Sequence, residues 1–185
     1  MIRKIALVVT VAVLLLSSGC AQEGILDSIR KRAEQGSAEA QFRLGGMYHY
    51  GEGVPQDYTE GLKWYRKAAE RGHVDSQLML GNRYYNGKGV PQDYTEALKW
   101  YQKAAEQGDA LAQTNLGFMY EQGEGVSQDY VRAYMWTSLA ASKLSDTPLQ
   151  EYRDQALKGR DLIEEKMTPE QIAAAKKLSR EWKPK

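Results

Sequence analysis

The chain has few of the residues from which disulfide scaffolds and most metal centres are built. It contains one cysteine, Cys20, and two histidines, His49 and His73, among 185 residues. A single cysteine cannot form an internal disulfide, and two separated histidines do not make a multi-histidine metal site. The sequence therefore predicts no disulfide framework and no bound metal, and no motif in it calls for a cofactor.

An excess of charge of either sign is also missing. Lysine and arginine number 25, against 24 aspartates and glutamates. Proteins that bind nucleic acid by neutralising its phosphates carry a basic surplus, so we expect no nucleic-acid partner. Hydrophobic residues at 42% beside charged residues at 26% are typical of an ordinary folded protein.

No apolar run reaches the length of about 20 residues that a membrane-spanning helix needs. A shorter run, residues 5–16, follows Arg3 and Lys4 and precedes the small residues 17–21. A basic start, a short apolar segment and a small-residue exit form the layout of an export signal. We therefore expect residues 1–19 to be a signal peptide, and the protein to reach the periplasm or the cell envelope of a Gram-negative bacterium.

Two cleavage chemistries fit the end of this signal. Cys20 directly after Gly19 resembles the lipobox of bacterial lipoproteins, in which the cysteine receives a diacylglycerol and becomes the new N-terminus. Ser17 stands where the common lipobox has leucine, and ordinary signal-peptidase cleavage after Ala21 is the alternative. A lipid on Cys20 is the only contact with a membrane that the sequence predicts.

From Ser37 onward the sequence repeats with a period of 36 residues. Residues 37–72 and 73–108 are identical at 22 of 36 positions, and residues 109–144 keep 14 identities with the copy before them. Repetition at this period indicates a stacked array of supersecondary units. The third copy has diverged most in its second half, as expected at the end of such an array.

Each copy predicts two amphipathic helices joined by a glycine-rich loop. The first helix carries a leucine, a glycine and a tyrosine at helical spacing, and a glycine-x-glycine-valine loop ends it. The second helix begins at an aspartate, followed in two copies by a glutamate with the spacing of a capping box, and holds a tryptophan and an alanine pair. The recurring residues are Leu44, Gly45, Tyr48, Val54, Asp57, Glu60, Trp64, Ala68 and Ala69, with equivalents 36 positions later.

These motifs, in this order, resemble the Sel1-like repeats, which are relatives of the tetratricopeptide repeats. The resemblance covers residues 37–144 and extends weakly backward over 26–36, where Ser28 replaces the tryptophan. It implies an all-α fold, a right-handed α/α superhelical solenoid of helix-turn-helix repeats. Members of the family are mostly adaptors of protein complexes, envelope and secretion proteins or host-interaction factors.

The last 41 residues predict a helical cap. Residues 148–166 have mostly helical apolar spacing, and Thr168, Pro169 and Gln171 form a strong helix start, with the helix running to about Trp182. Stacked repeats need a polar-faced end. The expected organisation is a signal peptide at 1–19, a linker and half-repeat helix at 20–36, repeats at 37–72, 73–108 and 109–144, and C-terminal capping helices at 145–185.

No catalytic constellation is visible. The loop at Gly51 and Gly53 lacks the strand and the lysine that a phosphate loop requires. Ser28 and Lys31 have the serine-x-x-lysine spacing of penicillin-recognising enzymes, but no companion motif accompanies them. A β-lactamase or penicillin-binding activity is claimed for a cysteine-rich branch of the family, and this chain has no cysteine in its repeats. We predict no enzyme activity, with such a hydrolase as the alternative.

The residues that differ between copies point away from the apolar stripe of the first helix. Tetratricopeptide-like superhelices line their concave groove with this face, so these positions are the predicted binding residues. They are Phe42, Gly46, His49, Leu78, Asn82, Tyr85, Thr114, Phe118 and Glu121. The favoured hypothesis is a non-catalytic exported scaffold that binds a protein or peptide through this face. A structural assembly factor for a secretion or polysaccharide-export complex is a further alternative.

Overall fold

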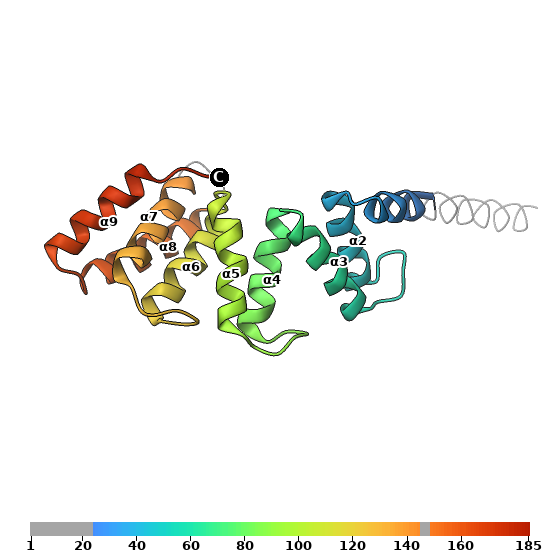
Figure 1. Cartoon of the computed structure of the whole chain (residues 1–185), viewed down its shortest axis with the longest axis horizontal. Helices are drawn as coiled ribbons and strands as arrows, with labels where there is room; N and C mark the ends of the chain where they lie inside the picture. Colours follow the sequence, from blue (N-terminus) through green and yellow to red (C-terminus); the bar gives the residue numbers. More distant parts are fainter. Residues whose placement is uncertain (1–23, 145–148) are drawn as a thin grey trace, which may run out of the picture. The chain divides into compact units, whose positions relative to one another are not determined.

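A computed structural model describes residues 24–144 and 149–185 (Figure 1). All regular secondary structure in these two ranges is helical. The chain divides into two compact units, one ending at Ala68 and the other spanning Ala69–Lys185. The predicted signal peptide and Cys20 lie outside the described residues.

The first unit contains one helix pair and the helical segment before it. Residues 24–34 are helical, α2 spans Ala38–Tyr50, and α3 spans Tyr58–Glu70, with its last two residues in the second unit. Ala33, Ala40 and Leu44 form the buried core between the segment and α2.

The second unit contains the remaining helices. They are α4 (Val74–Asn86), α5 (Tyr94–Glu106), α6 (Ala110–Gln122), α7 (Tyr130–Lys143), α8 (Gln150–Glu164) and α9 (Pro169–Glu181). The helices α4 and α5 pack as one pair and α6 and α7 as the next, while α5 contacts α6 and both α8 and α9 contact α7 (Figure 1). The all-α fold predicted from the repeats is confirmed.

Within each pair, the glycine of the leucine-glycine motif lets the two helices meet at backbone distance. A Cβ added to Gly81 would lie 2.5 Å from Cδ1 of Tyr101, a ring that is almost fully buried. In the third copy Thr137 replaces the tyrosine, and a Cβ at Gly117 would lie 2.6 Å from its Cγ2. The glycine is therefore required by packing, since any side chain would displace the neighbouring helix.

The loop within each repeat is bounded by two caps. Gly51, Gly87 and Gly123 end the first helices in the left-handed conformation, with φ of 74°, 67° and 74°. The second helices begin at aspartate caps, and Oδ1 of Asp93 accepts the backbone N–H of Glu96 at 2.9 Å.

The predicted capping box is only half right. The backbone N–H of Asp93 donates to the carbonyl of Tyr84 at 2.9 Å, so it has no need of the glutamate side chain. Glu96 instead pairs with Lys99 at 3.0 Å, and Glu60 pairs with Lys63 at 2.9 Å. The aspartate cap joins the two helices of a repeat, which a local sequence motif does not reveal.

Two sets of recurring glutamines fasten the repeats. Inside each repeat, a loop glutamine donates to a carbonyl near the end of the first helix, as Gln92 does to Tyr85 at 2.8 Å. Between successive helix pairs, the buried Gln77 donates from Nε2 to the carbonyl of Ala69 at 2.9 Å, and Gln113 donates to Ala105 at 3.2 Å. Equivalent bonds are made by Gln56, Gln128 and Gln41.

The helices α8 and α9 pack against α7 of the third repeat, and α8 also contacts α6. Thr168 and Gln171 form a reciprocal capping box at the start of α9, with Pro169 in its first turn. Ile163 from α8 and Ala175 from α9 lie in the same core cluster as Trp136. The indole of Trp182 meets that of Trp136 edge-on at 5.9 Å between centroids.

Candidate functional site

The predicted binding residues fall in both units. Phe42, Gly46 and His49 belong to the first unit, where Phe42 lies 5.6 Å from the ring of Tyr65. His49 meets the ring of Tyr58 edge-on at 5.0 Å between centroids. The other six predicted residues lie on α4 and α6 of the second unit.

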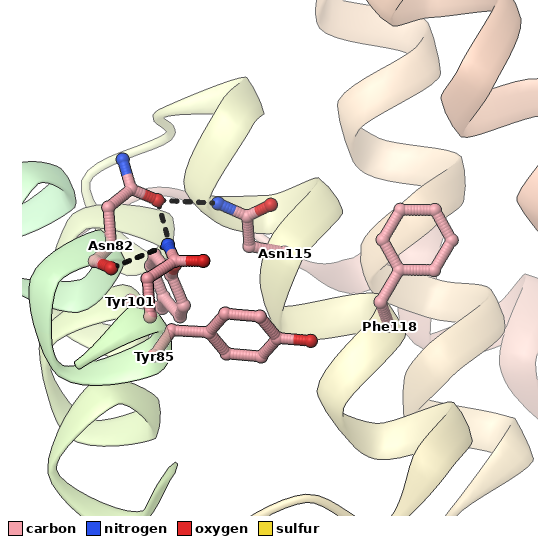
Figure 2. Close-up of a pocket in the computed structure, with 6 residues that line it drawn as sticks. Asn82, Tyr85, Tyr101, Asn115 and Phe118 are labelled. Atoms are coloured by element: carbon pink, nitrogen blue, oxygen red, sulfur yellow. Dashed lines mark hydrogen bonds between the residues drawn. The ribbon is translucent and has the colours of Figure 1, made fainter. Parts of the chain in front are cut away.

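The structure gathers five of those six, all but Glu121, around two cavities on the second unit. The first cavity has a volume of about 190 Å³ and is lined by Asn82, Tyr85, Asn86, Tyr101, Asn115 and Phe118 (Figure 2). The second, of about 270 Å³, shares three of these residues, Asn82, Asn115 and Phe118, and adds Leu78, Leu111, Thr114, Tyr152 and Gln155. Because they share lining residues, the two cavities form one groove along α4 and α6, which we call the α4–α6 groove.

The helix α8 bounds one side of the α4–α6 groove. Tyr152, on α8, is 44% exposed and lines the second cavity together with Gln155. Further along α8, a Cβ added to Gly159 would lie 3.0 Å from the ring of Phe118. The helix α8 is thus part of the candidate site, because it supplies the aromatic side chain of Tyr152 to the groove and packs against the ring of Phe118.

Asn82 is the centre of a polar cluster in the groove. Its Oδ1 accepts the hydroxyl hydrogen of Tyr101 at 2.8 Å and an Nδ2 hydrogen of Asn115 at 3.4 Å. The Asn86 side chain donates from Nδ2 to the backbone carbonyl of Asn82 at 2.7 Å. Side chains from α4, α5 and α6 therefore meet at one point, where they hold both asparagine amides in place (Figure 2).

Two tyrosines of the groove, Tyr85 and Tyr101, are held in their neutral form. The pKa of Tyr85 is raised to about 12, mainly by burial of the phenol and secondly by the hydrogen bond to Glu124 and its negative charge. The pKa of Tyr101 is raised well above its usual range, mainly by burial of the phenol and secondly by the electrostatic effect of Tyr85. Neither phenol can serve as a base near neutral pH, so both act as hydrogen-bonding and packing groups.

Two predicted positions have structural roles instead. Thr114 is buried, lines the second cavity, and donates its hydroxyl hydrogen to the carbonyl of Ala110 in its own helix at 2.9 Å. Glu121 is 8% exposed, and its Oε1 lies 2.7 Å from Nζ of Lys166. Lys166 follows α8, so the expected face of α6 is covered at this point by a chain segment that the repeat pattern does not describe.

The prediction from the sequence did not include several groove residues, because they lie outside the chosen helix face or outside the repeats. Asn115 occupies a position that differs in each copy, being Arg43 in the first and Met79 in the second. That variability was an available signal. The α8 residues carried none, because they lie beyond the third copy.

The histidines have structural surroundings. His73 caps the start of α4, accepting the backbone N–H of Ser76 on its Nδ1 at 3.3 Å. Among residues 24–144 and 149–185, no group of three or more histidine, cysteine, aspartate or glutamate side chains could hold a metal ion. In the same part of the chain, no helix combines the length and apolar character needed to cross a membrane.

The fold and the 36-residue unit define an α-helical repeat protein. The Sel1 repeat family matches residues 38–73, 74–109 and 110–143. The chain belongs to this family, which confirms the resemblance found in its motifs.

Two solved structures share this architecture. A Sel1 repeat protein from Oxalobacter formigenes is 37% identical, with a TM-score of 0.64 over 70% of this chain and 97% of that one. The protective antigen c5321 of uropathogenic Escherichia coli, described as an SLR fold, is 34% identical with a TM-score of 0.62. That match covers 83% of this chain and 36% of the antigen. No curated protein shows a significant match to the chain.

Membership places the chain in a class with a common mode of action. Sel1 repeat proteins are generally scaffolds for protein–protein interaction, and they are generally not enzymes. Their partners are proteins.

Proposed function

We propose that this protein is an exported, non-catalytic scaffold that binds a protein or peptide partner in the cell envelope through the α4–α6 groove. The observation that carries the proposal is the groove itself, with two cavities that share Asn82, Asn115 and Phe118. Asn82 is exposed and Phe118 half-buried, although the neighbouring core leucines Leu80 and Leu116 are fully buried.

Divergence between the copies supports the same site. The position of Asn82 is glycine in the first copy and phenylalanine in the third, whereas the core leucine before it is the same in all three. Packing of the repeats requires the core leucine, but it does not require a particular residue two positions later, where Asn82 lies. Surface positions of this kind are free to adapt to a partner.

Export is the second part of the proposal, and it rests on residues 1–21. Cell fractionation should place the protein in the envelope, and intact-mass measurement of the mature chain distinguishes its two forms. A diacylated N-terminus at Cys20 supports anchoring, whereas an unmodified start at Gln22 supports a periplasmic protein. Retention of Met1 with a cytoplasmic location would contradict export.

Crosslinking in the living cell tests the groove. A photoreactive phenylalanine analogue at Tyr152 replaces one exposed aromatic side chain by another at the cavity wall. The matched control places it at Tyr50, which is 64% exposed and lies outside both cavities. We expect a crosslinked protein partner from position 152 that is absent from position 50 and is lost when Tyr85 and Phe118 are both alanine. Equal crosslinking from both positions would contradict the groove.

A hydrolase is the weaker alternative. Ser28 and Lys31 are both exposed on the helical segment 24–34, and neither lines a cavity described above. We expect the purified protein not to hydrolyse nitrocefin. Turnover that disappears in Ser28→Ala would overturn the scaffold proposal.

A further inference from the structure

The α4–α6 groove has no charged lining residue. Asparagine, glutamine, threonine, tyrosine, phenylalanine and leucine form its walls. A carboxylate or ammonium group that loses its water needs a partner of opposite charge, and without one its burial is costly. The groove therefore favours an uncharged ligand segment over a charged one.

The groove presents a donor and an acceptor at the two ends of one hydrogen-bonded asparagine pair. The Tyr101 hydroxyl and the Asn115 amide both donate to Oδ1 of Asn82. The Nδ2 hydrogens of Asn82 are therefore the groups that can donate to a ligand. Because Asn115 donates in this pair, its carbonyl oxygen is the acceptor. Figure 2 shows these two groups, Nδ2 of Asn82 and Oδ1 of Asn115, at the outer ends of the pair.

An extended polypeptide segment can satisfy both of these groups. Each backbone residue carries one C=O acceptor and one N–H donor, so an extended segment can accept from Asn82 and donate to Asn115. The asparagines are held by hydrogen bonds before a ligand arrives, which reduces the entropy lost on binding. Backbone pairing of this kind gives affinity without restricting the sequence of the partner.

The second cavity adds a site for a side chain. Leu78 from α4, Leu111 and Phe118 from α6 and Tyr152 from α8 supply aliphatic and aromatic walls. Two leucines in the wall suit an aliphatic or aromatic side chain better than a sugar ring, which has hydroxyl groups around its edge that need hydrogen-bonding partners.

We propose that the α4–α6 groove binds an uncharged, extended peptide segment whose backbone pairs with Asn82 and Asn115 and whose apolar side chain fills the cavity beside Leu78 and Phe118. This inference rests on the proposed function and adds the chemistry of the partner. The specificity is for one apolar anchor and for the absence of charge on its immediate neighbours.

Peptide selection tests the inference. A random dodecapeptide library displayed on phage is selected on the purified exported protein, and each selected peptide is then measured against Asn82→Asp and Asn115→Ala. Asn82→Asp keeps an oxygen for the Tyr101 hydroxyl but replaces the amide donor by a carboxylate. Gln102→Ala is the matched control, because Gln102 is an exposed amide on α5 that bonds to Glu106 of its own helix and lines neither cavity. Circular dichroism confirms that each variant folds.

We expect selected peptides to share an uncharged stretch around one aliphatic or aromatic residue. Their affinity should fall about tenfold in Asn115→Ala, as expected for one or two lost hydrogen bonds, and remain unchanged in Gln102→Ala. Replacing the backbone amide beside the anchor by an ester should weaken binding by a similar factor in the native protein and have little further effect in Asn115→Ala.

Three outcomes would overturn the inference in distinguishable ways. Groove-dependent peptides that share acidic or basic residues would refute the neutral segment and leave the groove as a protein-binding site. Groove-dependent binding to an oligosaccharide array, with no peptide selected, would replace the peptide by a glycan and refute the proposed function as well. Peptides insensitive to Asn82→Asp and Asn115→Ala would show that the site lies elsewhere, even if the protein remains a scaffold.

Discussion

Gly45 lies directly against the ring of Tyr65, and a Cβ at position 45 would stand 2.8 Å from Cδ1 of that ring. The next residue, Gly46, faces different surroundings: its added Cβ would have only the Tyr65 hydroxyl within 4 Å, at 3.5 Å. Two adjacent glycines of α2 therefore have different reasons to be there. One is required by the close approach of two helices, and the other lies where a side chain can be accommodated.

Alanine substitution separates these roles. Gly45→Ala should lower the free energy of unfolding by up to about 2 kcal/mol, because overpacking a core costs roughly 1–3 kcal/mol against a helix-propensity gain of about 1 kcal/mol. Gly46→Ala should raise it by about 0.5–1 kcal/mol, since it has the propensity gain without the clash. Urea unfolding measures both, and an equal effect of the two substitutions would contradict the packing argument.

The buried glutamines supply a second prediction. Gln77→Leu removes the donor to the Ala69 carbonyl and the oxygen that accepts from Gln107 at 2.8 Å. The Ala69 carbonyl keeps the Gly72 N–H, and Gln107 keeps its bond to the Gly72 carbonyl, so the substitution removes hydrogen bonds without leaving these groups unpaired. A hydrogen bond contributes about 0.5–1.5 kcal/mol, and we expect a loss of about 1–2 kcal/mol in urea unfolding. The control Gln102→Leu changes an exposed glutamine of α5 and should leave stability within about 0.5 kcal/mol of the native value. A Gln77→Leu protein as stable as this control would show that the bond does not fasten the repeats.

The third prediction concerns the ion pair between Lys166 and the buried Glu121. The hydrogen bond and the negative charge of Glu121 raise the pKa of Lys166, which shows that the pair favours the charged lysine. Lys166→Met leaves the Glu121 carboxylate without this partner, and we expect a lower urea midpoint. Lys176→Met breaks a pair in which Glu164 is about a third exposed, and it should cost less.

The Lys166→Met loss should be largely restored by adding Glu121→Gln, because the neutral amide tolerates burial better than an unpaired carboxylate. If the double variant is less stable than Lys166→Met alone, the stabilising contribution of Glu121 lies in another contact.

The fourth prediction concerns the alkaline titration of Tyr85. The Tyr85 pKa is about 12 in the folded chain against an ordinary value of 10.0. Between these pH values the unfolded chain loses the Tyr85 proton while the folded chain retains it, so the contribution to stability is complete below pH 10 and disappears as the pH rises toward 12.

Wild-type stability should therefore fall more steeply over this interval than that of Tyr85→Phe, which has no proton to lose. The chain has 12 tyrosines, so the difference in tyrosinate absorbance between the wild type and Tyr85→Phe gives the titration of Tyr85. In Glu124→Gln the Tyr85 pKa should move down, because the charge that disfavours the phenolate is gone. An unchanged titration in that variant would place the cause in burial alone.

Removal of the last helix supplies a fifth. Deleting residues 167–185 uncovers Trp136 and the face of α7 that packs on α9, and exposed apolar surface at the end of a repeat array favours self-association. We expect aggregation in size-exclusion chromatography and a lower melting temperature. A truncated protein that remains monomeric and melts as the full chain does would contradict the capping role.

Most of the fold could be predicted from the sequence, because the repeats present the same local signals in each copy. The glycine loops, the aspartate caps and the threonine-proline start of α9 mark the helix ends that the structure shows. The capping-box glutamates were predicted wrongly. A three-residue spacing cannot show that the Asp93 backbone N–H is already bonded to Tyr84 in another helix.

The candidate site was less accessible to sequence reasoning. Helical periodicity identifies a face of α4 and α6, which includes Asn82 and Phe118. It does not show that Lys166 covers Glu121, since the two residues are 45 positions apart and only one of them belongs to a repeat. The glutamines recur in every copy and could have been noticed, but a polar residue among apolar neighbours is easily assigned to the surface.

The glutamine that reaches back to the preceding alanine recurs in successive copies. Gln77 meets Ala69 and Gln113 meets Ala105 through the same atoms and nearly the same separation. A further 36-residue unit spliced in after residue 108 would carry the same glutamine at its start and the same alanine near its end. Arrays of different length can arise from such a gene by duplication alone, each with a fresh set of outward positions open to selection.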